Sequence, residues 1–184
     1  MSISSIDDEQ SRALLRRTIR TIPDFPQPGI LFRDITPVLA DPVAFTTAVE
    51  LHLHQIQDLA EQIDVIVGME SRGFLFGPIL AHRLNAAFVP ARKPGKLPGK
   101  TLEERYELEY GQNILQLHAD AFARGARVLI VDDLLATGGT AAATARLVTR
   151  LGGEVLGLLF LIELAALGGR APLADFRVDA LLEF

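Results

Sequence analysis

The run from Val128 to Thr140 constrains the fold of this chain more than any other feature. Its first four residues are apolar, and Asp132 and Asp133 follow them directly. Small and hydroxyl-bearing residues then lead into Ala141–Val148, which has the composition of a helix. Open α/β sheets bind ligands at the carboxyl ends of buried strands, and helix N-termini attract anions. The run therefore predicts a strand, an acidic corner and a phosphate-binding loop.

Details of this run favour a sugar phosphate as the ligand. It has neither the Gly-Lys-Ser/Thr of a Walker A loop nor the Gly-x-Gly-x-x-Gly of a dinucleotide site. Carboxylates accept hydrogen bonds from vicinal hydroxyls, so Asp132 and Asp133 are predicted to hold those of a ribose. The predicted 5′-phosphate site consists of Ala136, Thr137, Gly138, Gly139 and Thr140. The alternative is a plain strand-to-helix turn with a solvated aspartate pair and a helix that starts at Thr140.

The same run resembles the phosphoribosyl pyrophosphate (PRPP) binding motif of the type I phosphoribosyltransferases, in the form typical of members that act on adenine. Further segments resemble other signatures of these members, in order, from about residue 20 to the C-terminus. They are Pro23–Pro37 at the N-terminus, Glu70–Pro78 in the pyrophosphate-loop region, and Ala91–Pro98 and Tyr106–Gly111 in the mobile hood.

The resemblance implies an α/β fold of the type I phosphoribosyltransferase kind, with a small hood. Alternating strand and helix patterns independently predict a central, mostly parallel sheet flanked by helices. Strands are expected at 64–68, 87–90, 127–131, 154–162 and 178–184, helices at 7–20, 41–60, 73–84 and 140–151, a hairpin at 106–118, and loops at 21–30 and 92–105. We predict a single domain over residues 1–184, with the hood formed by about 21–36 and 92–118.

Composition narrows the class of protein. A chain of 184 residues that is 49% hydrophobic suits one domain with a proper core. It has no cysteine, so it can form neither a disulfide nor a thiolate metal site. The start lacks the layout of a secretory signal and no apolar run reaches membrane-spanning length, so we expect a soluble cytoplasmic protein without a membrane partner. The net charge of −5 argues against nucleic acid as a partner.

An acidic chain that binds anionic PRPP needs a local cluster of positive charge. The resemblance implies that Arg72 binds pyrophosphate, that the peptide between Glu70 and Ser71 is cis, and that Lys93 contacts pyrophosphate. We assign Lys96, in the same basic loop, to PRPP as well. From the residues alone, Arg72 also fits a surface position at a helix start, and the basic loop fits a solvated one.

Catalysis is assigned to Glu109 and Arg72. The resemblance implies transfer of the phosphoribosyl group to N9 of adenine, which gives AMP and pyrophosphate. Glu109 is then the candidate general base, and Tyr110 belongs to a lid that excludes water. Strand alternation places Glu107 and Glu109 on one face, so only the resemblance chooses between them.

Three further expectations follow from the resemblance. The backbone of Leu31 and Arg33 is expected to contact adenine, and Phe32 to stack on it, although Phe32 also fits a core position. Mg²⁺ is expected to bind through PRPP with few protein ligands, and the spacing of the four histidines indicates no zinc site. Relatives that donate residues of the basic loop to a neighbouring subunit imply a homodimer.

Two alternatives remain at this point. One is a phosphoribosyltransferase that acts on another purine base, which the hood sequence argues against. The other is a PRPP-binding regulator that has lost catalysis. Such a regulator should carry a nucleic-acid-binding extension, and its hood residues would be dispensable, yet both Glu109 and the hood sequence are present.

Overall fold

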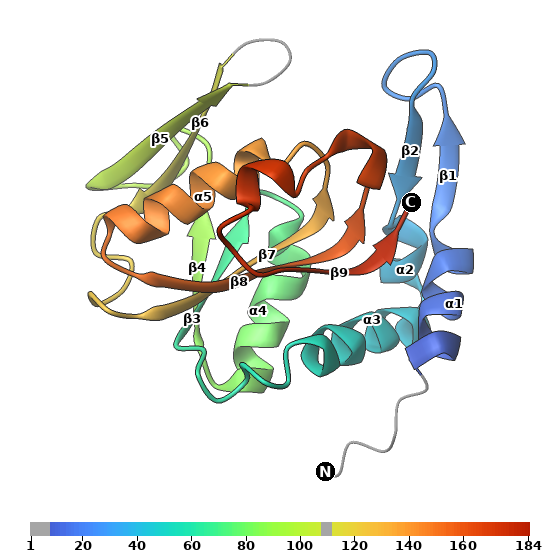
Figure 1. Ribbon diagram of the computed structural model, residues 1–184, viewed down its shortest axis with the longest axis horizontal. Helices are drawn as coiled ribbons and strands as arrows, with labels where there is room; N and C mark the ends of the chain where they lie inside the picture. The colour runs from blue at the N-terminus through green and yellow to red at the C-terminus, as the bar shows by residue number, and fades with distance from the viewer. Residues whose placement is uncertain (1–7, 108–111) are drawn as a thin grey trace. The chain divides into compact units, whose positions relative to one another are not determined.

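The computed structural model describes residues 8–107 and 112–184, and the chain forms two compact units, Met1–Gln55 and Ile56–Phe184 (Figure 1). The single domain predicted over residues 1–184 stays a prediction. Within the described residues, no helix is both long and apolar enough to cross a membrane.

The N-terminal unit combines a short hairpin with three helices. Its elements are α1 (Asp8–Thr18), β1 (Arg20–Pro23), β2 (Leu31–Asp34), α2 (Thr36–Ala40) and α3 (Pro42–Gln55). The strands are antiparallel, with Arg20 opposite Asp34 and Pro23 opposite Leu31. The loop predicted over 21–30 is therefore wrong at its start, because a proline can end an edge strand without preventing it. The helices predicted over 7–20 and 41–60 both end earlier, at Thr18 and Gln55.

A five-stranded parallel sheet forms the centre of the second unit, which confirms the predicted fold class (Figure 1). Its strands, in spatial order, are β4 (Ala87–Ala91), β3 (Val65–Met69), β7 (Arg127–Leu135), β8 (Glu154–Glu163) and β9 (Val178–Glu183). From β3 the chain crosses to β4 on one side, and from β7 it crosses to β8 on the other. The order therefore reverses between β3 and β7, the place where open α/β sheets bind ligands.

Strand β7 is longer than the sequence predicted. We expected it to end at Val131, but it runs to Leu135. Its pairing with β3 ends where Gly68 lies opposite Val131, whereas its pairing with β8 continues and places Asp132 opposite Phe160. The two aspartates are therefore part of the strand, and not a corner after it. This difference decides which way each carboxylate points.

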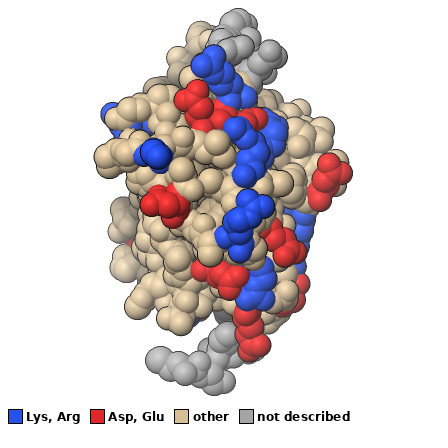
Figure 2. All heavy atoms as spheres, turned by 90° about the vertical axis from the view of Figure 1, so that its left-hand side faces the viewer, with Lys and Arg blue, Asp and Glu red and all other residues tan. Residues whose placement is uncertain are grey.

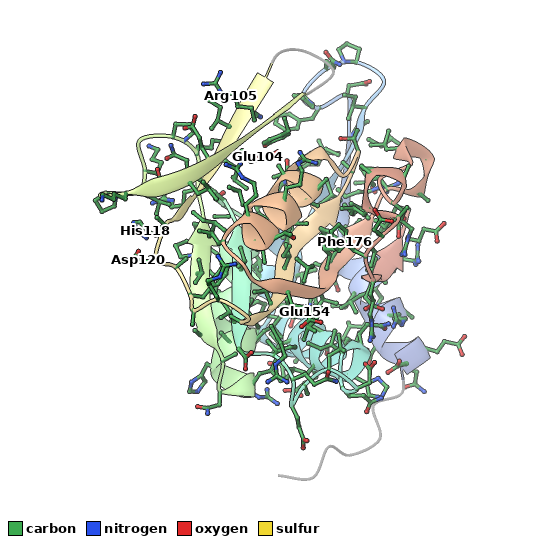
Figure 3. The ribbon with its side chains drawn as sticks, turned by 60° about the vertical axis from the view of Figure 1, so that its left-hand side comes forward. Glu104, Arg105, His118, Asp120, Glu154 and Phe176 are labelled. Carbon is green, nitrogen blue, oxygen red and sulfur yellow. The ribbon has the colours of Figure 1, made fainter. Side chains whose placement is uncertain are left out.

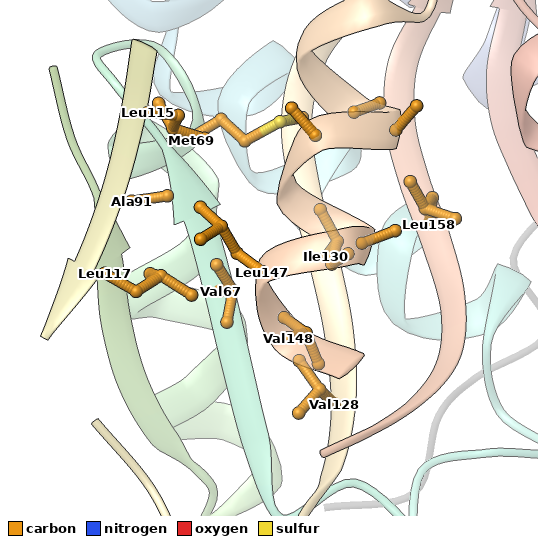
Figure 4. Packing of buried hydrophobic residues seen from close by; sticks show 14 of the residues in the cluster. Val67, Met69, Ala91, Leu115, Leu117, Val128, Ile130, Leu147, Val148 and Leu158 are labelled. Carbon is orange, nitrogen blue, oxygen red and sulfur yellow. The ribbon is translucent and has the colours of Figure 1, made fainter. Parts of the chain in front are cut away.

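Buried apolar residues fill the space between the sheet and α5 (Gly139–Arg150), which Figure 4 shows from close by. Val67, Val128 and Ile130 from the sheet meet Leu147 and Val148 of the helix, and all five side chains are buried. Burial of this apolar area contributes about 25 cal/mol per Å². The packing fixes the position of α5, and with it the helix N-terminus, relative to the ends of β3 and β7.

An antiparallel hairpin, β5 (Thr101–Glu107) and β6 (Gln112–His118), also packs on α5. Glu104 accepts hydrogen bonds from Arg146 at 2.6 Å and Arg150 at 2.7 Å on that helix. Figure 3 shows Glu104 on the side of the hairpin that faces α5 and Arg105 on the opposite side. The hairpin is confirmed, but the loop predicted over 92–105 is wrong from Thr101 onward. The pairing partner of Thr101, His118, lies far along the chain, so local composition did not reveal the strand.

Candidate active site

A pocket of about 260 Å³ opens at the carboxyl ends of β3 and β7, where the strand order reverses. The β7–α5 loop and the hairpin complete its walls. The polar or charged side chains that line it are Glu70, Arg72, Lys93, Tyr106, Asn113, Asp132, Thr137 and Thr140. A second cavity of about 250 Å³ shares Glu70, Arg72, Lys93 and Asp132 with the first, and Ser71 also lines it. The two cavities together offer room for two linked anionic groups.

The β7–α5 loop has the geometry of an anion-binding cradle. Gly138 has a φ of 81°, a left-handed conformation that favours glycine, and α5 begins at the next residue without a side-chain cap. The first N–H groups of a helix have no partner inside the helix and attract negative charge. Because Gly138, Gly139 and Thr140 line the pocket, these N–H groups are suited to a phosphate.

Two glycines, Gly138 and Gly169, let this loop pack closely against the segment that contains Gly169, which the sequence analysis did not identify. A Cβ on Gly138 would lie 2.2 Å from the carbonyl oxygen of Gly169, and a Cβ on Gly169 would lie 2.2 Å from that of Ala136. No side chain fits at either position without moving backbone. The segment that contains Gly169 is held in turn by Arg170, which forms a 2.7 Å ion pair with the buried Glu163. Only the tertiary structure reveals this role, because the sequence around Gly168 and Gly169 gives no sign that Gly169 packs against the β7–α5 loop.

The two aspartates of β7 lie in different environments. Successive residues of a strand point to opposite faces, so Asp132 lines the pocket and Asp133 does not. Asp133 is buried, and its Oδ2 accepts a hydrogen bond from Nε of Arg72 at 2.8 Å. Burial, together with the neighbouring Asp133 carboxyl, raises the pKa of Asp132 well above its ordinary value. Burial also raises the pKa of Asp133, although Arg72 opposes that rise.

The turn after β3 brings positive charge to the same edge. The Glu70–Ser71 peptide is cis, as the resemblance implied, and α4 (Gly73–Leu84) follows Arg72 directly. A Cβ on Gly73 would lie 2.5 Å from the carbonyl oxygen of Val131, so glycine lets this turn approach β7 closely.

Glu70 organises the basic segment after β4. Its carboxylate accepts the backbone N–H of Lys93 at 2.9 Å and pairs with Arg92 at 3.2 Å. Burial raises the pKa of Glu70, but the Lys93 N–H and the charges of Arg92 and Lys96 outweigh that effect and hold it below its ordinary value. Lys93 lines both cavities, whereas the exposed Lys96 lines neither. Sequence reasoning missed the part of Glu70 here, because its partners are a backbone N–H and an arginine more than 20 residues further along the chain.

The pocket thus brings together most of the predicted PRPP-binding residues: Arg72, Lys93, Asp132, Ala136, Thr137, Gly138, Gly139 and Thr140. Asp133 and Lys96 lie outside its lining. Glu109 and Tyr110, the predicted base and lid residue, fall outside the described residues. Tyr106, whose hydroxyl accepts a hydrogen bond from Thr140 at 3.1 Å, was not predicted. The sequence could have indicated Tyr106, because strand alternation places it on the same face of β5 as Leu102 and Glu104.

The predicted adenine residues lie on β2 of the N-terminal unit. Leu31 is 55% exposed, and Phe32 packs edge-to-face on Phe25 with ring centroids 5.1 Å apart. Arg33 donates a hydrogen bond to the hydroxyl of Thr21. Phe32 is half-buried, so neither the stacking role nor the core role is decided by its burial.

Charge is arranged locally, and not over the whole surface. On the face shown in Figure 2, Lys and Arg side chains lie among Asp and Glu side chains. Both signs of charge also meet in the two cavities, where Arg72 and Lys93 supply positive charge beside the carboxyl groups of Glu70 and Asp132. Helix N–H groups, two carboxyl groups and two cations at a sheet edge are the features of a class of protein suited to a sugar that carries two anionic groups.

Comparison with known proteins identifies this class. A family model described as the phosphoribosyl transferase domain matches residues 36–176. The adenine phosphoribosyltransferase of Gloeobacter violaceus is 56% identical over 161 residues, which cover 88% of this chain and 93% of that protein. The chain therefore belongs to the phosphoribosyltransferase family, of the type I fold.

Within that family, the relatives are adenine phosphoribosyltransferases. The crystal structure of the enzyme from Thermoanaerobacter pseudethanolicus has a TM-score of 0.91 and 50% identity, and covers 94% of this chain and 99% of its own. The enzyme from Saccharomyces cerevisiae, complexed with an imino-altritol bisphosphate and adenine, has a TM-score of 0.90 and 43% identity. It covers 95% of this chain and 99% of its own.

Proposed function

We propose that this chain transfers the 5-phosphoribosyl group of PRPP to N9 of adenine, giving AMP and pyrophosphate in purine salvage. The observation that supports this proposal best is the pair of cavities that share Glu70, Arg72, Lys93 and Asp132. The first cavity ends in the N–H cradle of the β7–α5 loop and suits ribose 5-phosphate. The second cavity, in which Arg72 and Lys93 are two of the five lining residues, suits pyrophosphate. The bond that breaks, between C1 of the ribose and pyrophosphate, then lies between the two.

The residues of the site divide the work of this reaction. Asp132 accepts hydrogen bonds from the ribose hydroxyls and holds the sugar while an oxocarbenium-like charge develops at C1. Arg72 and Lys93 stabilise the negative charge of the departing pyrophosphate. The Thr140 hydroxyl, oriented by Tyr106, faces the 5′-phosphate cradle. Glu109 accepts the imidazole proton of adenine as N9 attacks C1.

Magnesium is part of this proposal. The described residues contain no group of three or more His, Cys, Asp or Glu that could hold a metal ion by themselves. Asp132 offers carboxylate oxygens at the junction of the cavities, which fits a Mg²⁺ bound mainly through PRPP oxygens and water. When bound, Mg²⁺ would neutralise pyrophosphate charge. The homodimer, the cytoplasmic location and the adenine contacts of Leu31, Phe32 and Arg33 also belong to this proposal.

PRPP-dependent nucleotide formation tests the proposal directly. Adenine, hypoxanthine, guanine and xanthine are offered separately with PRPP and Mg²⁺, and nucleotide and pyrophosphate are quantified. We expect AMP from adenine and little turnover of the other bases. No turnover of any base would favour a PRPP-binding regulator, and turnover of an oxopurine alone would favour another specificity.

Glu109→Ala tests the assignment of the base. Loss of a positioned general base costs about 10²- to 10⁴-fold in the rate of the chemical step. We therefore expect a single-turnover rate constant reduced by that factor, with PRPP affinity little changed. Glu107→Ala is the matched control, since Glu107 lies two residues earlier on the same predicted face. An unchanged single-turnover rate constant in Glu109→Ala would show that Glu109 is not the general base.

A further inference from the structure

The Arg72–Asp133 ion pair indicates that the two adjacent aspartates of β7 have different tasks. Asp132 lines both cavities, whereas Asp133 lines neither, since neighbouring residues of a strand point to opposite faces. The Asp133 side chain is 4% exposed, and the Arg72 side chain is 47% exposed. A carboxylate this deeply buried cannot reach a ribose in the pocket without leaving its arginine.

Asp133 and Arg72 depend on each other through this contact. Asp133 Oδ1 has no hydrogen-bond partner among the described residues, so Arg72 is the main source of compensation for the buried carboxylate. The contact at 2.8 Å uses Nε of Arg72, one of the five N–H groups of a guanidinium. This contact leaves the four Nη N–H groups for other acceptors, and Arg72 lines both cavities.

The backbone around this pair is held just as closely. Gly73 follows Arg72, and its Cα lies so near Val131 that an added Cβ would be 2.5 Å from the carbonyl oxygen. The turn after β3 and the strand that carries Asp133 therefore keep a fixed separation. Long cationic side chains lose conformational entropy when they are ordered, and an anchored Nε removes much of that cost before the ligand arrives.

We propose that Asp133 is a positioning residue, which holds the guanidinium of Arg72 in place for the pyrophosphate group of PRPP and does not bind the ribose hydroxyls. The proposal rests on the proposed function, because it assumes that PRPP occupies the two cavities. It replaces the prediction that both aspartates clamp the ribose, and leaves that task to Asp132.

Two product ligands separate these roles, because AMP contains the ribose but no pyrophosphate. Binding of AMP, and separately of pyrophosphate with Mg²⁺, is measured by calorimetry for wild type, Asp133→Asn, Arg72→Ala and the double variant. We expect Asp133→Asn to weaken pyrophosphate binding by about 10- to 100-fold, the effect of losing an oriented charged hydrogen bond, and to leave AMP affinity unchanged. In the Arg72→Ala background, Asp133→Asn should have no further effect on pyrophosphate, since both changes remove the same contact.

Asp132→Asn serves as the matched control, and we expect it to weaken AMP binding. If Asp133→Asn lowers the affinity for AMP and leaves that for pyrophosphate unchanged, Asp133 binds the ribose after all. If the affinity for both ligands falls equally, the substitution disturbs the site in general. Either result overturns the proposal. Asp133→Glu, which keeps the charge but shifts it by one methylene, gives the same comparison if Asp133→Asn does not fold. If wild type binds neither ligand, the proposed function fails, and the positioning role fails with it.

Discussion

Asp132 shows how a single residue can favour ligand binding at the expense of the free protein. It is a partly buried carboxyl beside a second carboxyl, and its pKa is raised by burial and by Asp133. A raised carboxyl pKa means that the folded chain binds a proton more tightly than the unfolded chain. Stability from this group is complete below the unfolded pKa, near 3.8, and is lost as the pH rises through the folded pKa.

Asp132→Asn should therefore stabilise the ligand-free protein in a pH-dependent way. We expect the free energies of unfolding of variant and wild type to be similar at pH 4. At pH 7, we expect the free energy of unfolding of the variant to be higher by about 1 kcal/mol. Urea denaturation at both pH values measures this. Asp64→Asn is the control, because Arg127 lowers the pKa of Asp64 to about 2. The stability that this carboxylate contributes is already largely present at pH 4, so Asp64→Asn should be less stable than wild type by nearly the same amount at both pH values. A difference for Asp132→Asn that does not change with pH would contradict this account.

At the scale of elements, the phosphate cradle depends on two loops that are packed backbone against backbone. Gly169→Ala places a methyl group 2.2 Å from the carbonyl oxygen of Ala136, so the β7–α5 loop must move. Overpacking of this kind costs about 1–3 kcal/mol. We expect PRPP affinity, measured by calorimetry, to fall by about tenfold or more, because the N–H groups of the cradle shift with the loop.

Gly168→Ala is the control for this prediction. Gly168 has a φ of 63° and open space around its Cα, so alanine there meets backbone strain but no clash. It should lower the stability by about 1 kcal/mol and leave PRPP affinity unchanged. If both variants lose the same affinity, the contact between Gly169 and Ala136 is not what shapes the cradle.

Over the molecule as a whole, sequence predicts what is encoded locally. Most strands of the parallel sheet contain apolar runs, so their existence and their order along the chain were predictable, and so was a loop over Ala136–Gly138 before a helix. Two kinds of feature were not. The length of β7 depends on its pairing with β8, and the face of Asp133 follows from that length. The parts played by Glu70 and Gly169 arise from contacts between segments that are distant in the chain, which no local pattern records.

Net charge is a property of the whole molecule, and it makes a prediction about salt. A chain with net charge −5 attracts an anion through local positive charge, and the field of its cations decays over about 8–10 Å at physiological ionic strength. We expect the Kd of PRPP to rise with NaCl between about 20 and 300 mM, a range over which the Debye length falls from about 20 Å to about 6 Å.

Lys93→Gln should both weaken PRPP binding and flatten this salt dependence, because Lys93 lines both cavities. Lys100→Gln, which removes an equal charge from a residue that lines neither, should leave the slope of log Kd against log salt unchanged. An equal change of slope in both variants would show that net charge, and not its position, governs PRPP binding.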